Sequence, residues 1–240
     1  MLYFVPFFQF GTVSLTHFNR WVEKERSNDY DLPYQRSALG FGLGLGYRAY
    51  IFDVGFDGRM LYSSSGATDV PLTTGVSFSY RHTLLNFIFS VPVGISYPLS
   101  ESFRLYAGAN LLMGFSNLYV YDSLHYSIFG SNVWSTEDAS LSSASTGMGV
   151  LLGGDIALSS SLSLFLRVGY EVLAFSGYKG KATYENSDGD TDEKTVYWVF
   201  NPNNNNIYLD TSPPGDGEVY AKEDLNGFRF SLGFKVLLGR

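Results

Sequence analysis

The sequence of 240 residues contains no cysteine, so the chain can form neither a disulfide nor a thiolate metal site. Charged residues are scarce too, because Asp, Glu, Lys and Arg make up 16% of the chain, against about 25% in an average soluble domain. A protein whose whole surface faces water usually carries more charged residues than this. Aromatic residues and glycine are abundant instead, with 18 Tyr, 20 Phe and 26 Gly.

Long apolar runs are also missing. The longest candidate, LLNFIFSVPVGI at 84–95, is interrupted by Asn86, Ser90 and Pro92 and falls short of the roughly 18 residues that a membrane-spanning helix needs. We therefore do not expect a helical membrane protein. The opening MLYFVPFFQF lacks the basic segment and the small-residue cleavage site of a signal peptide. We expect either a mature form that carries a start Met or a protein that is not exported.

A cluster of basic residues is absent as well. The formal net charge is −7, and most of the excess lies in 176–224, where ten Asp or Glu stand against four Lys or Arg, a balance of −6. Binding to nucleic acid calls for a clustered basic face rather than an acidic segment. We therefore expect no nucleic-acid partner.

Apolar residues alternate with small or polar ones through most of the chain, and we find little that is typical of a helix with period 3.6. In SLSLFLRVGYEV (161–172), Leu and Val share one face, whereas Ser, Arg and Glu share the other. This pattern predicts an all-β chain with a single domain, 1–240. We expect eight strands, at 3–18, 35–48, 50–62, 76–97, 102–121, 145–158, 161–175 and 225–238.

Short and long connections alternate between these strands. The short ones lie at 47–50, 97–102 and 158–161, and the long polar ones lie at 19–34, 63–75, 122–144 and 176–224. The last loop is expected to carry its own hairpin, TVYWVF and IYLD around NPNNNN. Its strands are too short to cross a bilayer, so we place the hairpin beyond the eight main strands.

Alternation alone fits two kinds of barrel, a soluble one of the lipocalin type that is apolar inside and a membrane barrel that is apolar outside. Gly40, Gly42, Gly44 and Gly46 all lie on the less apolar face of GFGLGLGY, where they give water no polar side chain. Glycine there fits a crowded lumen, because it leaves room for long side chains from other strands. We therefore predict a transmembrane, antiparallel, up-and-down β-barrel with its long loops on one side.

Ionisable residues recur on the inferred lumen face. The predicted lumen charge network consists of Arg48, Asp53, Asp57, Arg59, Arg104, Asp155, Arg167, Glu171, Arg229 and Lys235. Buried charges are tolerated when they are paired and hydrogen-bonded, and the interior of an eight-stranded barrel is about filled by its own side chains. We therefore expect salt bridges across the lumen. Arg167 and Glu171, four residues apart on one strand, should pair with other strands rather than with each other.

Eight alternating strands, short turns on one side, long loops on the other and a closing GFRFSLGFKVLL (227–238) resemble the small eight-stranded bacterial outer-membrane β-barrel superfamily. Its members include the OmpA transmembrane domain, OmpX, OmpW and the opacity proteins. The resemblance implies a multi-pass barrel in the bacterial outer membrane, with periplasmic termini and extracellular loops. It also implies contact with membrane lipid and lipopolysaccharide, insertion by the barrel assembly machinery, and a monomeric state.

Some relatives in this superfamily are lipid A deacylases, which use a His-x-Ser pair and a Glu on the lipid-facing wall. His125, Ser127 and Glu137 offer these residue types, but they lie in the loop expected at 122–144, and a His-x-Ser match is common by chance. The other two histidines have no evident nucleophile nearby. We expect no enzyme, no catalytic residues and no cofactor.

The segment NSDGDTDE (186–193) places Asp188, Asp190 and Asp192 at alternate positions, and calcium prefers such carboxylate oxygens. The segment lacks the glycine and the final Glu of an EF-hand loop. We expect a solvated acidic loop and no metal, with a calcium loop as the alternative.

Three classes of function remain open. The first is a surface-exposed structural or binding protein, adhesin-like, in which the long loops contact a host factor, another cell or a phage. The second is a narrow porin-like channel or conduit for small or hydrophobic solutes, as in OmpW. Soluble carriers and enzymes form the third.

Overall fold

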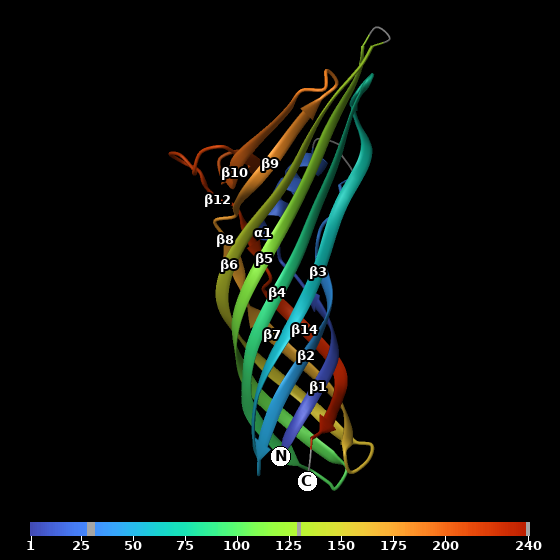
Figure 1. The fold of residues 1–240 in the computed structure, drawn as a ribbon, viewed down its shortest axis with the longest axis vertical. Coiled ribbons are helices and arrows are strands. Elements are labelled where there is room, and N and C mark those ends of the chain that lie inside the picture. Colours follow the sequence, from blue (N-terminus) through green and yellow to red (C-terminus); the bar gives the residue numbers. More distant parts are fainter. Residues whose placement is uncertain (28–31, 129–130, 239–240) are drawn as a thin grey trace.

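The computed structural model describes residues 1–27, 32–128 and 131–238, and it consists mainly of antiparallel strands (Figure 1). Eight of the described strands close into a ring: β1 (Leu2–Thr12), β2 (Ser37–Ala49), β3 (Phe52–Thr73), β4 (Val76–Pro98), β5 (Phe103–Ile128), β6 (Ser131–Ala157), β7 (Leu162–Val172) and β14 (Gly227–Leu237). The ring is closed because β1 pairs with both β2 and β14. The expected eight-stranded antiparallel barrel is therefore confirmed. The start of β1, the end of β14 and the short turns lie at one end, called the turn end below.

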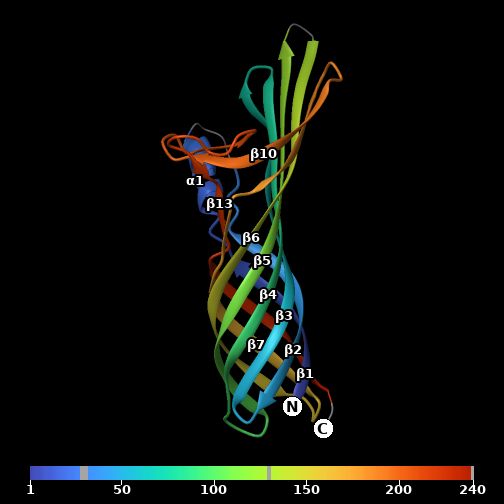
Figure 2. The same ribbon diagram turned by 60° about the vertical axis from the view of Figure 1, so that its left-hand side comes forward.

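Four strands are much longer than a membrane crossing requires. β3, β4, β5 and β6 contain 22, 23, 26 and 27 residues, whereas about 9–11 residues of a tilted strand span a bilayer. Their far ends leave the barrel as a tall curved sheet (Figures 1 and 2). We call this sheet, together with the segments between and beside its strands, the extension.

One helix and six short strands complete the extension: α1 (Thr16–Ser27), β8 (Ala174–Ser176), β9 (Lys179–Asn186), β10 (Thr191–Asn201), β11 (Asn206–Asp210), β12 (Val219–Tyr220) and β13 (Lys222–Asp224). β6 pairs with β7 over 148–157 and with β9 over 135–142, so its two halves belong to the barrel and to the extension. β10, β11 and β12 continue the sheet from β9. β8 and β13 pair only with each other within the described strands, and β13 lies next to α1 (Figure 2).

The expected loops are wrong over most of their length. In their place the structure has most of α1 within 19–34, the far end of β3 within 63–75, a β5–β6 hairpin within 122–144 and β9 to β13 within 176–224. Residues 28–31 and 129–130 of these expected loops lie outside the described residues. The hairpin expected around NPNNNN is confirmed, because β10 and β11 pair up to Asn201 and Asn206.

The long arms look like loops in the sequence because they are polar on their outer face. β5 and β6 nevertheless pair without interruption from Phe103 opposite Ile156 to Ile128 opposite Ser131. Antiparallel pairing satisfies the backbone N–H and C=O groups, so a sheet with one polar face can stand in water. Polarity therefore marks a change of solvent here rather than the end of a strand.

α1 corrects the expected strand at 3–18, which ends at Thr12, and the expectation of no helix. After β1, Phe18, Trp21 and Val22 follow at spacings of three and four residues. An amphipathic helix brings such residues to one face, and Phe18 and Val22 are indeed buried in the core. This apolar stripe is short and directly follows an alternating strand pattern, so the helix is difficult to recognise in the sequence.

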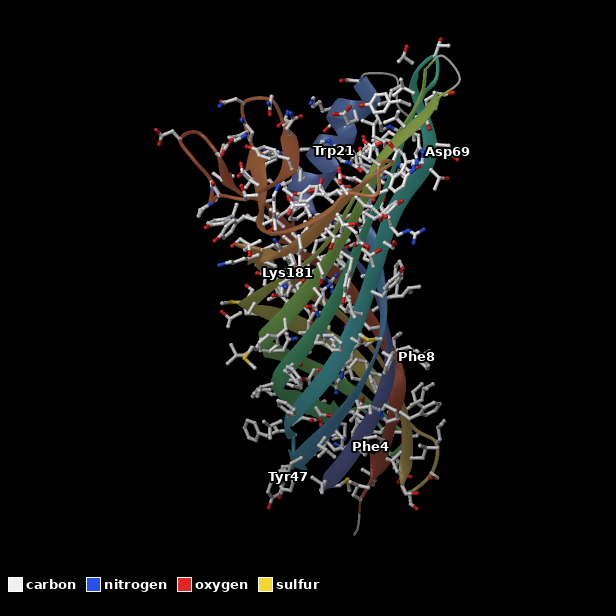
Figure 3. The ribbon with its side chains drawn as sticks, turned by 45° about the horizontal axis from the view of Figure 1, so that its top comes forward. Phe4, Phe8, Trp21, Tyr47, Asp69 and Lys181 are labelled. Carbon is white, nitrogen blue, oxygen red and sulfur yellow. The ribbon has the colours of Figure 1, made fainter. Side chains whose placement is uncertain are left out.

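The two faces of the barrel have opposite polarity. Leu111 on β5 is 66% exposed and Met148 on β6 is 64% exposed, whereas Glu171 and Lys235 are 1% and 2% exposed. Phe8 points away from the barrel wall in Figure 3. The apolar face is therefore outside, as in a membrane barrel and opposite to a soluble carrier. Among the described residues, no helix is long and apolar enough to cross a membrane.

The apolar core lies where the barrel passes into the extension. It includes Leu61, Leu84, Leu118, Leu141, Phe175, Tyr178, Val196 and Trp198. Phe175 of β8 packs over Gly114 of β5, where an added Cβ would lie 2.6 Å from the phenyl ring. Glycine is required at this position because β8 crosses above the lumen so closely. The extension end of the lumen is thus covered by apolar side chains.

Candidate functional site

One cluster of charges fills the lumen near the turn end. Arg48 Nη2 lies 2.6 Å from Asp53 Oδ2 on the neighbouring strand and 2.9 Å from Asp155 Oδ2 on β6, on the opposite wall. Lys235 Nζ lies 2.6 Å from the same Asp155 oxygen. The hydroxyl of Tyr3 donates a hydrogen bond to Asp53. Two cations and two carboxylates therefore hold four strands together across the interior.

A second cluster lies deeper in the barrel, around Glu171 of β7. Arg59 of β3 donates from Nη2 to both carboxylate oxygens at 2.7 Å and so crosses the lumen. Asn110 donates a hydrogen bond of 3.0 Å to Oε1, and Arg229 Nε lies 3.4 Å from Oε2. Arg229 also donates to the carbonyl of Leu225. One buried carboxylate thus pairs with two buried guanidinium groups.

Three of the ten predicted network residues join neither cluster. Asp57 accepts a hydrogen bond of 2.7 Å from Ser90 Oγ, and the guanidinium of Arg167 lies 4.0 Å from the ring centre of Tyr106. Arg104 borders a polar cavity of about 420 Å³ at the turn end. Within the described part of the chain, none of these three makes an ion pair shorter than 4.0 Å. The charges therefore form two separate clusters, not one continuous network.

The residues that could suggest lipid A deacylation do not meet. His125 and Ser127 belong to β5 rather than to a loop, and both are exposed on one face of the sheet. Glu137 of β6 is paired with Asp122, which alternates with His125 and so lies on the opposite face. The expected loop position was wrong, and the three side chains form no catalytic group.

The acidic segment forms the turn between β9 and β10. The backbone N–H groups of Asp188 and Asp190 both donate to Asn186 Oδ1 at 3.0 Å, which shapes the turn. Asp192 lies 2.8 Å from Lys194 Nζ. Among the described residues, no group of three or more His, Cys, Asp or Glu side chains could hold a metal ion.

Sequence reasoning missed a buried polar chain at the base of the extension. Gln35 donates from Nε2 to Ser63 Oγ (2.8 Å), so its Oε1 faces His82 Nδ1 at 2.6 Å. His82 must therefore carry its proton on Nδ1, and its Nε2 faces Glu223 Oε1 at 3.4 Å. Glu223 is fully buried, and neither of its oxygens accepts a hydrogen bond among the described residues. No spacing in the sequence links residues so far apart along the chain.

Burial shifts both titrating groups of this chain toward their neutral forms. It lowers the pKa of His82 from 6.5 to about 3. It also raises the pKa of Glu223 well above 4.5, with a further increase from the charge of Asp224. A neutral imidazole facing a protonated carboxyl is the arrangement that leaves no unpaired charge in the core.

A second missed feature is a carboxyl pair on the inner face of the extension. Asp122 of β5 lies directly opposite Glu137 of β6. Burial, and then the charge of Glu137, raise the pKa of Asp122 to about 7. Burial also raises the pKa of Glu137, which a hydrogen bond from Tyr184 partly offsets. The two carboxyls border a cavity of about 160 Å³ that is otherwise lined mainly by aromatic and aliphatic side chains.

Comparison with solved structures gives similar folds at low identity. OprG from Pseudomonas aeruginosa, an outer membrane protein, has 11% identity, a TM-score of 0.48 and coverage of 98% of this chain and 94% of its own. Neisserial surface protein A has 13% identity, a TM-score of 0.40 and coverage of 98% and 97%. The outer membrane protease OmpT from Escherichia coli has 8% identity, a TM-score of 0.35 and coverage of 99% and 95%.

A search of curated protein sequences gives no match. The family model described as outer membrane protein beta-barrel domain, by contrast, matches residues 11–195, which is most of the chain. This match agrees with the closed ring, the apolar outer wall and the charged lumen. The chain therefore belongs to the family of outer membrane β-barrel domains.

Proposed function

We propose that this outer-membrane β-barrel protein acts at the cell surface as a binding protein, and that the extension carries its binding sites. The observation that carries the proposal is the length of β4, β5 and β6 together with the apolar core that orders their far ends. A barrel needs neither feature to cross the membrane. An ordered platform with a cavity bordered by α1, β10 and β11 is suited to holding a partner.

The lumen supports a structural role for the barrel itself. Its two charge clusters join opposite walls, and the cavity between them measures about 50 Å³. Apolar side chains, among them Phe175, cover the extension end. An axial pore would require both clusters and this cover to move. The barrel therefore serves best as an anchor for the extension.

Orientation is tested first, by labelling single cysteines. Because the native chain has none, Lys181→Cys on the exposed face of β9 and Ser160→Cys in the β6–β7 turn provide unique thiols at opposite ends. A membrane-impermeant maleimide on intact cells should label position 181 at once and position 160 only after permeabilisation. The reverse pattern would place the extension in the periplasm and reject the proposal.

Binding is tested on cells that display the chain. Wild type is compared with a variant in which a short Gly-Ser linker replaces residues 178–220, and a heat-dependent gel shift verifies that the variant barrel has formed. Retention on epithelial monolayers and aggregation of the displaying cells should both be measured. Loss of either behaviour in the variant supports the proposal. Identical behaviour of the two strains in both assays would refute it.

A second candidate, a conduit for small or hydrophobic solutes, is favoured by a defect in the barrel wall. The β3–β4 ladder pairs Val54 with Val93 and then Asp57 with Ser90, and it skips the positions between them. Pro92 lies in this gap and has no N–H to donate. The cavity of about 50 Å³ between the two charge clusters, called the central cavity below, is bordered by Pro92 and also by outward-facing Phe56, so it lies close to this gap.

Planar bilayer recordings separate the two candidates. A conduit should give conductance steps that Arg104→Ala at the turn end and Arg167→Ala at the central cavity both change, because these cations border its path. The surface-binding proposal expects no steps at any voltage. Conductance that both substitutions alter would make the conduit the primary function.

A further inference from the structure

A row of polar side chains crosses the inner face of the extension. Residues directly opposite each other in antiparallel strands share a face. The pairings place five residues in this row, one from each of β4, β5, β6, β9 and β10: Tyr80, Asp122, Glu137, Tyr184 and Asp192. Two carboxyls lie side by side at its centre, which is an unfavourable pairing for ionised groups.

Two hollows meet at this pair. The first, about 160 Å³, lies between the row and the residues Phe18 and Trp21 of α1, with Trp198 of β10 on a further side. The second, about 400 Å³, lies on the side of Tyr184 and the β9–β10 turn. Asp122 and Glu137 border both hollows. A ligand in either hollow would therefore contact the two carboxyls.

No side chain of the described residues neutralises this pair. Lys194, two residues from Asp192 on β10, is bound to Asp192 at 2.8 Å and lies 5.5 Å from the ring centre of Tyr184. Arg81 borders the first hollow, but its side chain is exposed, and the pKa of Asp122 is raised by burial and by the charge of Glu137. The cavity thus holds anionic charge that lacks a cation.

The remaining walls are mainly aromatic, and Val120, Ile207 and Leu209 form their aliphatic part. Trp21 and Tyr80 meet edge to face at 5.3 Å, and Phe18 lies 5.7 Å from Trp21. Aromatic faces attract cations, and ammonium groups are the cations best suited to cages of this kind. An apolar small molecule would fit the aromatic walls but would leave the carboxyl pair dry and uncompensated. A metal ion would match the carboxyls but would gain little from the rings.

We propose that this cavity, bordered by Trp21, Tyr80, Asp122, Glu137 and Trp198, binds an organic ammonium group. The ammonium lies between the carboxyl pair and the aromatic faces, and its alkyl body fills the smaller hollow. The inference rests on the proposed function, because it names a ligand class for the extension. The same chemistry could come from a free amine or from a lysine side chain of a partner, and the test separates these two sources.

The test uses the full chain in a non-ionic maltoside micelle, which avoids phosphocholine headgroups that would compete. Trp134→Phe removes the tryptophan outside the cavity and leaves Trp21 and Trp198 as fluorescent reporters. Choline is titrated as the free cation, and 3,3-dimethyl-1-butanol serves as its uncharged isostere. Choline should quench the fluorescence saturably, whereas the alcohol should bind at least about tenfold more weakly.

Substitutions then assign the binding to the carboxyl pair. Asp122→Asn and Glu137→Gln should each weaken choline binding by about tenfold, because each removes charge from a desolvated site. Asp138→Asn is the matched control, since Asp138 is exposed on the other face of β6. It should change the affinity by less than about twofold. Equal binding of choline by all three variants would overturn the proposal, as would equal binding of the alcohol.

The pH dependence gives an independent readout. An ammonium favours the ionised form of Asp122, so choline should bind more tightly as the pH rises from about 6 to 8. Asp122→Asn should abolish this increase. The other titratable and charged groups that border the two hollows are Tyr80, Arg81, His82, Glu137, Tyr184, Glu185, Asp190, Asp192 and Tyr208, and Lys194 pairs with Asp192. An increase that survives in the double variant Asp122→Asn/Glu137→Gln would assign it to a group outside the carboxyl pair and contradict the proposal.

A tripeptide with a central lysine, compared with its Nε-acetylated form, distinguishes the source of the ammonium. If the lysine peptide binds more tightly than choline and acetylation abolishes its binding, the ammonium comes from a polypeptide partner. If the lysine peptide binds more weakly than choline, the ligand is a free amine. No saturable binding of choline or of the lysine peptide rejects the inference. In that case, cell adherence that still depends on residues 178–220 would leave the proposed function standing, so the two failures are distinguishable.

Discussion

Glu223→Gln should change how the stability of the extension depends on pH. Glu223 and His82 together hold one proton in the folded protein, since His82 Nδ1 donates to Gln35 and its Nε2 faces a carboxyl that accepts no hydrogen bond from the residues that the structure describes. In the unfolded chain the same two groups titrate near 4.5 and 6.5. The folded protein keeps its proton through this whole range because burial opposes charge on either group.

The magnitude follows from counting protons. Between pH 4.5 and 6.5 both states hold one proton on the pair, so the pair gives no slope. Above 6.5 the unfolded pair has lost its proton, and each pH unit then lowers the free energy of unfolding by about 1.4 kcal/mol while native Glu223 stays protonated. Below 4.5 the unfolded pair holds two protons, and stability falls again as the pH decreases.

Glu223→Gln keeps the shape of the side chain and removes the titration. The variant should therefore lose the decline above pH 6.5 and keep the decline on the acid side, which now begins near 6.5 because only His82 titrates. Urea unfolding of the extension, followed by Trp198 fluorescence in micelles from pH 4 to 9, measures both limbs. Trp198 is a suitable reporter because its ring centre lies 5.4 Å from that of His82.

The control is Glu101→Gln, the same chemical change at an exposed turn of the barrel. It should reproduce the wild-type profile. A wild-type profile without a decline above pH 6.5 would refute the shared-proton reasoning. The same conclusion would follow if Glu223→Gln declined as steeply as wild type.

Two further predictions concern the barrel. Glu171→Gln should lower the free energy of unfolding by about 3–5 kcal/mol, because it leaves two buried guanidinium groups without a carboxylate; a urea midpoint in micelles equal to that of Glu101→Gln would contradict this. Leu111→Arg on the lipid-facing wall should cost about 2–4 kcal/mol, whereas Tyr119→Arg, eight residues farther along the same face of β5, should cost about 0–1 kcal/mol. Equal costs in the same unfolding assay would mean that both positions meet the same solvent.

The barrel itself was predictable because its information is local. A lumen-facing Gly44 and a lipid-facing Leu45 differ by one position, and this alternation persists from strand to strand. The charges show which face of the strands lines the lumen, because Arg59, Glu171 and Lys235 can be buried together only on a face where they are near one another. The division of the charges into two clusters was not predictable, since it depends on the position of each residue along the barrel axis.

The extension was harder to predict because its information is nonlocal. Its strands are polar outside and apolar inside, the reverse of the barrel, so the far end of β5 resembles a loop when it is compared with the near end. Asp122 and Glu137 are fifteen positions apart along the chain, and only the register of β5 and β6 brings them together. The contact between His82 and Glu223 depends on β13, a strand of three residues that no pattern marks.

The reversal of polarity along a single strand locates the boundary between lipid and water. On β5 the exposed outward side chains are apolar at Leu111, Met113 and Phe115 and polar at His125 and Ser127, with Tyr119 and Tyr121 between them. Leu118, at the same height as these tyrosines, points inward and is fully buried. The pairing of β5 with β6 continues unchanged through this stretch, so no slip of register accounts for the switch. The switch is explained if the outer face passes from lipid to water at this height. The lumen of the barrel, surrounded by lipid, is then polar, and the core of the extension, surrounded by water, is apolar. β4, β5 and β6 therefore continue as one sheet that has a charged interior in the membrane and an apolar core above it.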